Sequence, residues 1–314
     1  MADIIKTATR DAYGKALVEL GDKMEKLVVF DADLAAATKT GMFKKAHPDK
    51  FIDCGIAEGN MMGVAAGMAS AGYTVFASSF AMFAAGRAFE QVRNTICYPH
   101  LNVKIGATHA GISVGEDGAS HQCCEDIALM RSIPGMTILN PADDVEARLA
   151  VLAAAEMDGP VYMRFGRLAV PRVFDENYKF EIGKGVYLTE GTDVTIVATG
   201  LMVERALAAA ELLKAEGISA AVINMATIKP LDKEILLDAA NKTGCIVTAE
   251  EHNIIGGLGS AVAEALAEIK PVPVLRVGVE DVFGKSGPAL ELLEIFGLNA
   301  ANIVAKAKAA IVLK

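Results

Sequence analysis

The sequence predicts an α/β fold of two domains, each a mostly parallel sheet flanked by helices. Short apolar segments alternate with helical segments of roughly ten or more residues along most of the 314-residue chain. A chain that returns through a helix after each strand builds a parallel sheet. One polar, proline-containing stretch interrupts the alternation, and this chain length is typical of two domains.

The first domain is predicted over residues 1–172. Its expected strands are residues 27–30, 51–54, 73–77, 103–107, 136–139 and 161–165, and its expected helices are residues 8–20, 58–69, 80–96, 121–131 and 144–157. We expect the strand at 51–54 to be central and to lead into an apolar helix that begins at Glu58. The helix dipole favours a carboxylate in a first turn, so Glu58 alone fits an ordinary first-turn acid as well as a functional residue.

The predicted linker, residues 173–182, lies in a polar stretch that follows Pro171. Alternation then restarts in the second predicted domain, residues 183–314. Its expected strands are residues 194–198, 220–223, 245–248 and 274–277, and its expected helices are residues 203–216, 232–241 and 260–269, followed by two terminal helices. Gly217 and Gly244 come just after predicted helix ends, where C-cap geometry favours glycine.

Composition narrows the class of protein. The chain is 53% hydrophobic, carries a net charge of −9 and has no basic block, which argues against nucleic acid as a partner. Charged residues and glycines break the apolar runs before membrane-spanning length, and residues 1–7 lack the pattern of an export signal. Five cysteines without C-x-x-C spacing favour free thiols and a cytoplasmic location. On the predicted helix the side chains of Cys123 and Cys124 diverge, which argues against a metal site there.

A glycine-rich run, Gly256 to Gly259, precedes a predicted helix and invites comparison with a dinucleotide-binding loop. Its spacing is not G-x-G-x-x-G, and no acidic strand end follows at the right distance. Helix packing and the binding of a small anion are the remaining interpretations.

The segment Thr108–Gln122 holds three glycines, two histidines and two acids directly after a predicted strand. Parallel sheets bind their ligands at the carboxyl ends of the strands. His109, Asp117 and His121 have side chains that can ligate a metal ion. The same side chains can also bind a polyol and transfer its protons, and we favour this second interpretation.

These motifs together resemble the transketolase family of thiamine diphosphate enzymes. Thr108–Gln122 reads T-H-x5-G-E-D-G-x2-H-Q, which is similar to the transketolase active-site loop. Gly55–Glu58 resembles the pyrimidine-domain motif of the wider family, and Phe76–Phe83 resembles its aromatic shelf for the cofactor. The linker, the Gly256–Gly259 run and residues 282–287 match in order. The similarity covers nearly the whole chain and the carboxy-terminal half to two thirds of a full transketolase.

The resemblance implies roles for the cofactor-binding residues. Glu58 would hydrogen-bond N1′ of the thiamine diphosphate pyrimidine, and it would be catalytic for that reason. Phe80 and Phe83, three positions apart on one face of the predicted helix, would stack on the pyrimidine ring; taken alone, they fit ordinary core residues equally well.

The resemblance also implies how a sugar phosphate would bind. His109, Asp117 and His121 would hold the hydroxyls of the donor, with His121 and His109 as the catalytic candidates. Arg164 would bind the phosphate by bidentate hydrogen bonds, with Arg167 and Lys39 as alternatives.

The family holds the diphosphate and its Mg²⁺ with a Gly-Asp-Gly motif and a downstream Asn. The sequence has no Gly-Asp-Gly, so we expect no metal ligands on this chain and a separate amino-terminal subunit that supplies them. An α2β2 assembly and a role in the carbohydrate metabolism of the pentose phosphate pathway follow from the resemblance. The chain departs from the usual family pattern at four positions: Ala57, Gly59, Gly86 and Ala110.

Other functions stay open. The same two domains occur in 1-deoxy-D-xylulose-5-phosphate synthase and in the beta subunit of 2-oxo acid dehydrogenases. The run Gly115–Gly118 matches transketolase better, because Asp117 would recognise a sugar hydroxyl that pyruvate lacks. A non-catalytic relative would be expected to have lost Glu58 or the His109–His121 loop, and both are intact.

Overall fold

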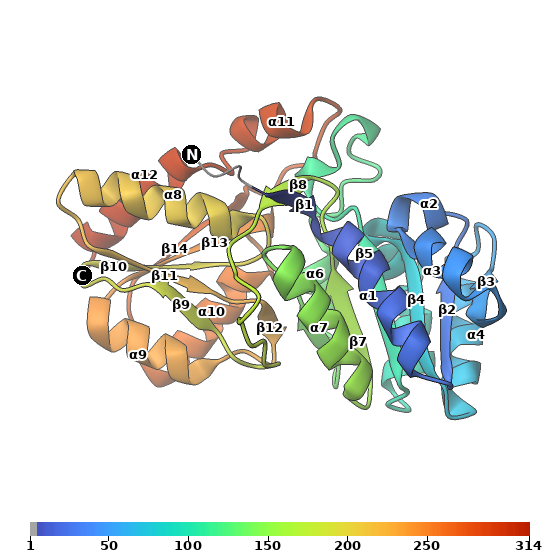
Figure 1. Ribbon diagram of the computed structural model, residues 1–314. Coiled ribbons are helices and arrows are strands. Elements are labelled where there is room, and N and C mark those ends of the chain that lie inside the picture. Colours follow the sequence, from blue (N-terminus) through green and yellow to red (C-terminus); the bar gives the residue numbers. More distant parts are fainter. Residues whose placement is uncertain (1–4) are drawn as a thin grey trace.

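A seven-stranded sheet and a five-stranded sheet form the centres of two α/β domains that lie side by side (Figure 1). The computed structural model describes residues 5–314. The prediction about an export signal concerns residues 1–7, of which residues 1–4 lie outside the described part. The predicted two-domain α/β fold is confirmed.

The first sheet has the strand order β12-β6-β7-β5-β4-β2-β3. Its strands are β2 (Leu27–Asp31), β3 (Phe51–Asp53), β4 (Thr74–Phe80), β5 (Val103–Thr108), β6 (Thr137–Leu139), β7 (Val161–Arg164) and β12 (Thr227–Lys229). Pairing is parallel throughout, except that β12 runs antiparallel to β6. The carboxyl ends of the parallel strands therefore meet at one edge, where ligands of such sheets bind.

Helices cover both faces of this sheet. One face packs against α1 (Thr9–Lys23), α3 (Thr40–Ala46) and α7 (Asp144–Glu156). The other face packs against α4 (Glu58–Ser70), α6 (Asp126–Arg131) and the segment 82–97. Short helices follow β2 and the β5 strand: α2 (Ala35–Thr38) and a 3₁₀ segment at Ile112–Asp117. Apolar residues on both faces explain why the central strands are almost completely buried.

The second sheet has the order β14-β13-β10-β11-β9. Its strands are β9 (Val186–Thr189), β10 (Val194–Ala198), β11 (Ala220–Asn224), β13 (Ile246–Asn253) and β14 (Val274–Val279). Helices α8 (Met202–Ala215) and α12 (Ala300–Val312) cover one face, and α9 (Lys233–Thr243) and α10 (Leu258–Ile269) cover the other (Figure 1). Helix α11 (Ala289–Ile295) packs against the Ile112–Asp117 segment of the first domain.

Strand β3 is at the edge of the first sheet, so the prediction that residues 51–54 form a central strand is wrong. A central parallel strand is buried on both faces and reads as an apolar run. Strand β3 has only three residues, ends in Asp53 and leaves Ile52 40% exposed. Helix α4 therefore begins beside an edge of the sheet, although it does begin at Glu58 as predicted.

Two predicted helices are also different in the structure. Strand β4 continues to Phe80, and the expected helix 80–96 is divided into π-helical turns at Met82–Arg87 and Val92–Cys97, with α5 (Phe89–Gln91) between them. The expected helix 121–131 begins only at Asp126, because Cys123 is extended and forms a bridge with Ala110. Insertions that widen a helix into π-turns are frequent near functional sites.

The two domains exchange main-chain contacts. Strand β12 follows the second domain's first three strands in the chain, yet it completes the sheet of the first domain. Near the start of the chain, β1 (Lys6–Ala8) pairs with β8 (Ala169–Pro171), just before the linker. The sequence pattern did not predict β1, β8, β9 or β12, because these short strands carry little periodicity and lie outside the alternation of strand and helix that located the others.

By length and composition, the segment Ala289–Val312 qualifies as a candidate membrane span, with a mean hydropathy of 1.3. It meets the length criterion only when α11 and α12 are counted together. Gly297, at a φ of +68°, and Asn299, which caps α12 through its side chain, separate the two helices. The longer one has 13 residues, or about 20 Å, against a hydrocarbon core of about 30 Å.

Asp143 fixes the linker to the first domain. Its carboxylate caps α7 by accepting a hydrogen bond from the Glu146 N–H at 2.8 Å, and it also accepts from the N–H groups of Val173 (2.7 Å) and Phe174 (2.8 Å). The side chain is fully buried. One carboxylate therefore satisfies three main-chain donors from two segments.

Replacing Asp143 with Ala should lower the free energy of unfolding by about 2–4 kcal/mol, because the cap is lost and two linker N–H groups keep no acceptor. Urea unfolding followed by circular dichroism measures the change. Asp144→Ala is the matched control, since it removes an ion pair with Arg172 that is partly exposed, and should cost at most about 1 kcal/mol. Equal losses in the two variants would contradict this role for Asp143.

Candidate active site

The predicted site residues gather at the carboxyl edge of the first sheet. Phe80 ends β4, His109 follows β5, and Arg167 follows β7 by three residues. Lys39 lies between α2 and α3, and Glu58 begins α4. The parallel topology brings these separate loops to one edge, as expected for this class of sheet.

His109 is held from several sides. It has a φ of +57°, is 3% exposed, and its ring stacks on Phe80 with centroids 3.8 Å apart. The guanidinium of Arg10 lies 2.8 Å from Nε2, and Thr108 Oγ1 lies 2.9 Å from Nδ1. Because arginine can only donate, Nε2 must accept, and Nδ1 then carries the proton and donates to Thr108. His109 is therefore fixed as one neutral tautomer.

Burial, followed by the nearby positive charges of Arg10, Arg167 and Lys39, lowers the pKa of His109 from 6.5 to about 3. The imidazole therefore stays uncharged in neutral solution. Both ring nitrogens are already paired, Nε2 with Arg10 and Nδ1 with Thr108, so the neutral ring can accept from a ligand hydroxyl only in place of Arg10. It is poorly suited to carrying a proton.

His121 lies beside the aromatic pair. Phe80 and Phe83 stack with centroids 6.1 Å apart, and the His121 ring meets Phe83 edge-on at 5.3 Å. The predicted pairing of the two phenylalanines on one helical face is wrong, because Phe80 belongs to β4 and Phe83 to the following π-turn. They nevertheless form one aromatic surface. His121 Nδ1 lies 3.0 Å from Ser120 Oγ, and its ring is only partly buried.

Glu58 is 2% exposed and pairs with Arg87. The Arg87 Nη1 donates to both carboxylate oxygens, at 3.1 and 2.9 Å. The same guanidinium lies 4.5 Å from the centroid of the Phe83 ring. The functional carboxylate predicted from the sequence and the predicted aromatic shelf are therefore neighbours, and Arg87 contacts both.

The side chain of Asp117 is 41% exposed, so this carboxylate lies at the surface of the loop and is not buried beside the two histidines. It is the last residue of the 3₁₀ segment at the rim of the loop, and its carboxylate lies 3.7 Å from Arg167 Nη1. Arg167 also donates to the Val114 carbonyl at 2.5 Å and remains 37% exposed. The rim therefore presents an acid and a cation to a ligand.

Three cations surround His109: Arg10, Lys39 and Arg167. Arg10, in the first turn of α1, is half-buried and also donates to the Ala37 carbonyl at 3.0 Å. Lys39 pairs with Asp11 at 3.1 Å. The sequence analysis missed Arg10, because nothing in a first-turn arginine at the start of the chain marks it as lying beside a loop a hundred residues away.

Arg164 is not available to a ligand, and its prediction as the main phosphate-binding residue is wrong. It is 3% exposed and forms a buried ion pair with Asp126 at 2.8 Å. Its Nη2 donates to the carbonyls of Cys123 (3.3 Å) and Glu251 (2.8 Å). It joins the active-site loop to the second domain, and the alternative, Arg167, is the arginine that reaches the surface of the site.

The second domain holds the loop through Glu251. This buried carboxylate accepts from the Ser113 N–H at 2.5 Å, and burial raises its pKa to about 7. Gly111, at a φ of +83°, lies so close to it that any Cβ there would collide with the Glu251 side chain. Gln122 adds a second tie by donating to the Lys285 carbonyl at 3.0 Å.

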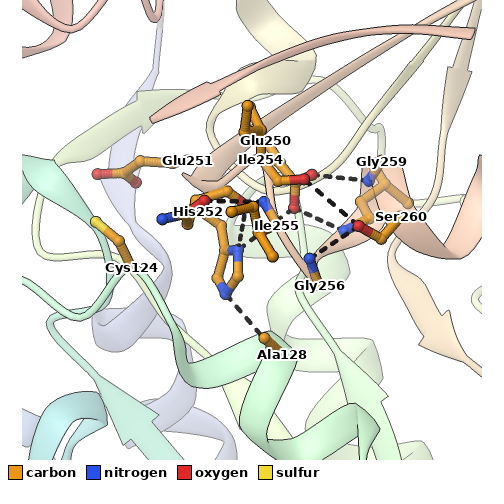
Figure 2. A network of polar contacts seen from close by, with 12 residues as sticks. Cys124, Ala128, Glu250, Glu251, His252, Ile254, Ile255, Gly256, Gly259 and Ser260 are labelled. Carbon is orange, nitrogen blue, oxygen red and sulfur yellow. Dashed lines mark hydrogen bonds and ion pairs between the residues drawn. The ribbon is translucent and has the colours of Figure 1, made fainter. Parts of the chain in front are cut away.

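Figure 2 shows the neighbouring residue, Glu250, turned to the other side of β13. Its carboxylate accepts from the N–H groups of Leu258 and Gly259, both at 2.7 Å, at the start of α10. The glycine-rich run therefore serves helix capping and packing, since an acid from the chain itself occupies the main-chain donors that a small anion would need.

Among residues 5–314, no group of three or more His, Cys, Asp or Glu side chains is arranged to hold a metal ion. His109 and His121 face the aromatic pair instead. The five cysteines are free, and Cys123 and Cys124 are buried. The geometry agrees better with binding of an organic, anionic ligand than with metal ligation by this chain.

Comparison with known proteins assigns the family. The family model described as transketolase, pyrimidine binding domain, matches residues 5–172, and the one described as transketolase, C-terminal domain, matches residues 183–303. This chain belongs to the transketolase family.

The most similar relatives include chains of the same length. A candidate transketolase C-terminal section from Methanocaldococcus jannaschii is 53% identical over 94% of this chain and 93% of that protein. The 6-deoxy-6-sulfo-D-fructose transketolase subunit of a Clostridium species is 47% identical over 94% of this chain and 92% of its own. Human transketolase is 40% identical over 94% of this chain, which spans 47% of the human protein.

A solved split-gene transketolase, described as an inactive β4 tetramer, is 58% identical and superposes with a TM-score of 0.92. The match covers 98% of this chain and 99% of that one. The resemblance to the carboxy-terminal part of a split transketolase, predicted from the loop and helix motifs, is confirmed. Membership in this family implies the use of thiamine diphosphate.

The ring of His109 should remain neutral at pH 5. Its pKa is lowered on folding, so the folded protein binds fewer protons than the unfolded chain between pH 6.5 and about 3. The free energy of unfolding therefore decreases as the pH falls through that window. NMR titration of ¹⁵N-labelled histidines measures the pKa, with His109→Gln for assignment. Arg10→Ala should raise it. A midpoint above pH 6 in the parent protein would contradict the geometry.

Proposed function

We propose that this chain is one subunit of a thiamine diphosphate-dependent transketolase, which transfers a two-carbon ketol unit from a ketose phosphate to an aldose phosphate. The proposal rests on one observation: Glu58, the Phe80–Phe83 pair and two histidines share one edge of the first sheet. The cofactor, when bound, supplies carbanion stabilisation for breaking a carbon–carbon bond beside a ketone.

The residues fit an aminopyrimidine. Glu58 offers a buried carboxylate at the start of α4, where the helix dipole stabilises its charge. Phe83 is partly exposed and offers a ring for stacking beside it. Glu58 would share a hydrogen bond with N1′, and the Phe80–Phe83 pair would fix the plane of the ring. Such a site excludes water from the carboxylate.

The sugar would bind along the His109–His121 loop. His109 is held neutral by burial and by Arg10, and its Nε2 would accept from a hydroxyl of the donor in place of Arg10. His121, less buried and at the edge of Phe83, is the better placed of the two to move a proton. Asp117 at the exposed rim would accept a hydrogen bond from a further hydroxyl.

Arg10, Lys39 and Arg167 would bind the anionic end of the substrate. Arginine recognises phosphate by two parallel hydrogen bonds, and several cations around one site also raise the rate of encounter. The Clostridium relative is named for a sugar that ends in a sulfonate rather than a phosphate. A sulfonate carries the same oxygen pattern, so both kinds of donor suit this cluster.

A separate amino-terminal subunit would supply the ligands of the diphosphate and of Mg²⁺. The sequence lacks Gly-Asp-Gly, and human transketolase is about twice as long as the matching part. Two relatives that match almost end to end are named as a section and as a subunit. The α2β2 assembly, the cytoplasmic location and a place in the pentose phosphate pathway belong to this proposal.

The two alternatives, the synthase and the dehydrogenase subunit, would bind a different class of substrate at this site. Both act on 2-oxo acids such as pyruvate, which offer fewer hydroxyls to a histidine and aspartate loop. The cation cluster and the exposed Asp117 favour a polyhydroxylated, anionic donor. Efficient turnover of pyruvate by the assembled enzyme would move the assignment to the synthase.

Reconstitution tests the proposal. The isolated chain with thiamine diphosphate and Mg²⁺ should show no ketol transfer, and addition of an amino-terminal chain that carries Gly-Asp-Gly and the downstream Asn should restore it. In the assembled enzyme, Glu58→Gln should lower kcat by about 10²–10⁴-fold, whereas Glu211→Gln, on an exposed carboxylate of α8, should not. Full activity of the isolated chain would disprove the need for a partner.

Arg167→Ala should lower kcat/KM for xylulose 5-phosphate by about 10–100-fold, because one charged hydrogen-bond partner of the phosphate is lost. Hydroxypyruvate, which has no phosphate, should be much less affected. Arg172→Ala is the control, since this arginine pairs with Asp144 outside the site. Equal losses on both donors would mean that Arg167 shapes the loop, through the Val114 carbonyl, without binding phosphate.

A further inference from the structure

Arg87 pairs with both oxygens of the Glu58 carboxylate. One guanidinium nitrogen, Nη1, lies 3.1 Å from Oε1 and 2.9 Å from Oε2 of the carboxylate. Glu58 is 2% exposed, so its charge is stabilised by this pair and by the start of α4, with little help from solvent. A ligand that hydrogen-bonds Glu58 and also lies on the Phe83 ring would compete with this guanidinium for the same contacts.

The guanidinium also covers the aromatic surface. The Arg87 Cζ lies 4.5 Å from the centroid of the Phe83 ring, which is the distance of a cation–π contact. Phe83 meets Phe80 and the edge of His121 on its other sides. A planar, nitrogen-rich group of this chain therefore donates to Glu58 and lies over the Phe83 ring at the same time.

These two contacts are the ones that an aminopyrimidine would make in the site described above. We propose that Arg87 acts as an internal plug, which closes the aminopyrimidine site of the subunit on its own and must swing out before the cofactor binds. The inference rests on the proposed function. Arg87 is not among the site residues that were predicted from the sequence.

The surroundings allow the movement. The Arg87 side chain is 52% exposed, so it can leave toward solvent without opening the core. It ends the π-helical turn Met82–Arg87 and follows Gly86, two features that lower the resistance of the main chain to a change of register. Glu90, three residues further along and exposed, can receive the released guanidinium.

A plug of this kind couples cofactor binding to assembly. If the closed arrangement is populated ten times more than the open one, the apparent affinity for the cofactor falls about tenfold. A partner subunit that holds Arg87 in the open position would remove this loss. The subunit alone would then be protected from binding half of a cofactor whose diphosphate it cannot hold.

Binding of thiamine to the isolated chain tests the plug. Thiamine has the aminopyrimidine and lacks the diphosphate, so it reports on this half of the site alone. Saturation-transfer NMR measures its dissociation constant for the parent, Arg87→Gln and Arg93→Gln, the last being an exposed arginine of the next π-helical turn. The expected result is a dissociation constant at least about tenfold lower for Arg87→Gln and unchanged for Arg93→Gln.

Binding to Arg87→Gln that is no tighter than to the parent, or absent from both, would overturn the plug. Circular dichroism and the thermal unfolding midpoint check that the variant is folded, and Arg87→Lys, which keeps the charge, should bind as weakly as the parent. The reconstituted pair separates this failure from that of the proposed function. If the two subunits together bind thiamine diphosphate and transfer ketol, while isolated Arg87→Gln binds thiamine no more tightly than the parent, only the plug is wrong.

Discussion

The loop that carries His109 and His121 is fixed by buried charges from both domains, and the geometry of the site depends on this constraint. Arg164, paired with Asp126, donates to main-chain carbonyls on either side of the domain boundary, while Glu251 reaches back to the Ser113 N–H. Removing one partner of such a buried pair costs about 3–5 kcal/mol, because the other charge stays behind without compensation. The interface therefore positions the loop as much as it stabilises the protein.

Positively charged side chains are concentrated around His109, and its imidazole nevertheless stays neutral. Arg10 donates to Nε2 of His109, and the same cation makes protonation of the ring unfavourable. The arrangement gives one group that only positions, His109, and one that is open to solvent, His121. Aromatic stacking on Phe80 and Phe83 ties both rings to the surface where a cofactor would lie.

Sequence patterns predicted the parts of the fold that depend on local periodicity. Alternating apolar and helical segments located the long strands and helices, and the first-turn position of Glu58 followed from its place after Gly55. Patterns could not choose between Arg164 and Arg167, three residues apart, because the choice depends on Asp126 and on a carbonyl of the second domain. Arg10 and Arg87 were missed for the same reason: each acts through a residue that is distant in the chain.

Strand β12 makes the first domain depend on the second for one of its strands. It belongs to the stretch of chain that follows the linker, yet it pairs with β6 and covers what would otherwise be an open, aggregation-prone edge of the first sheet. A chain divided at the linker would leave that edge of β6 uncovered in the amino-terminal piece, so the first sheet depends on residues 227–229 of the second domain for its outer strand.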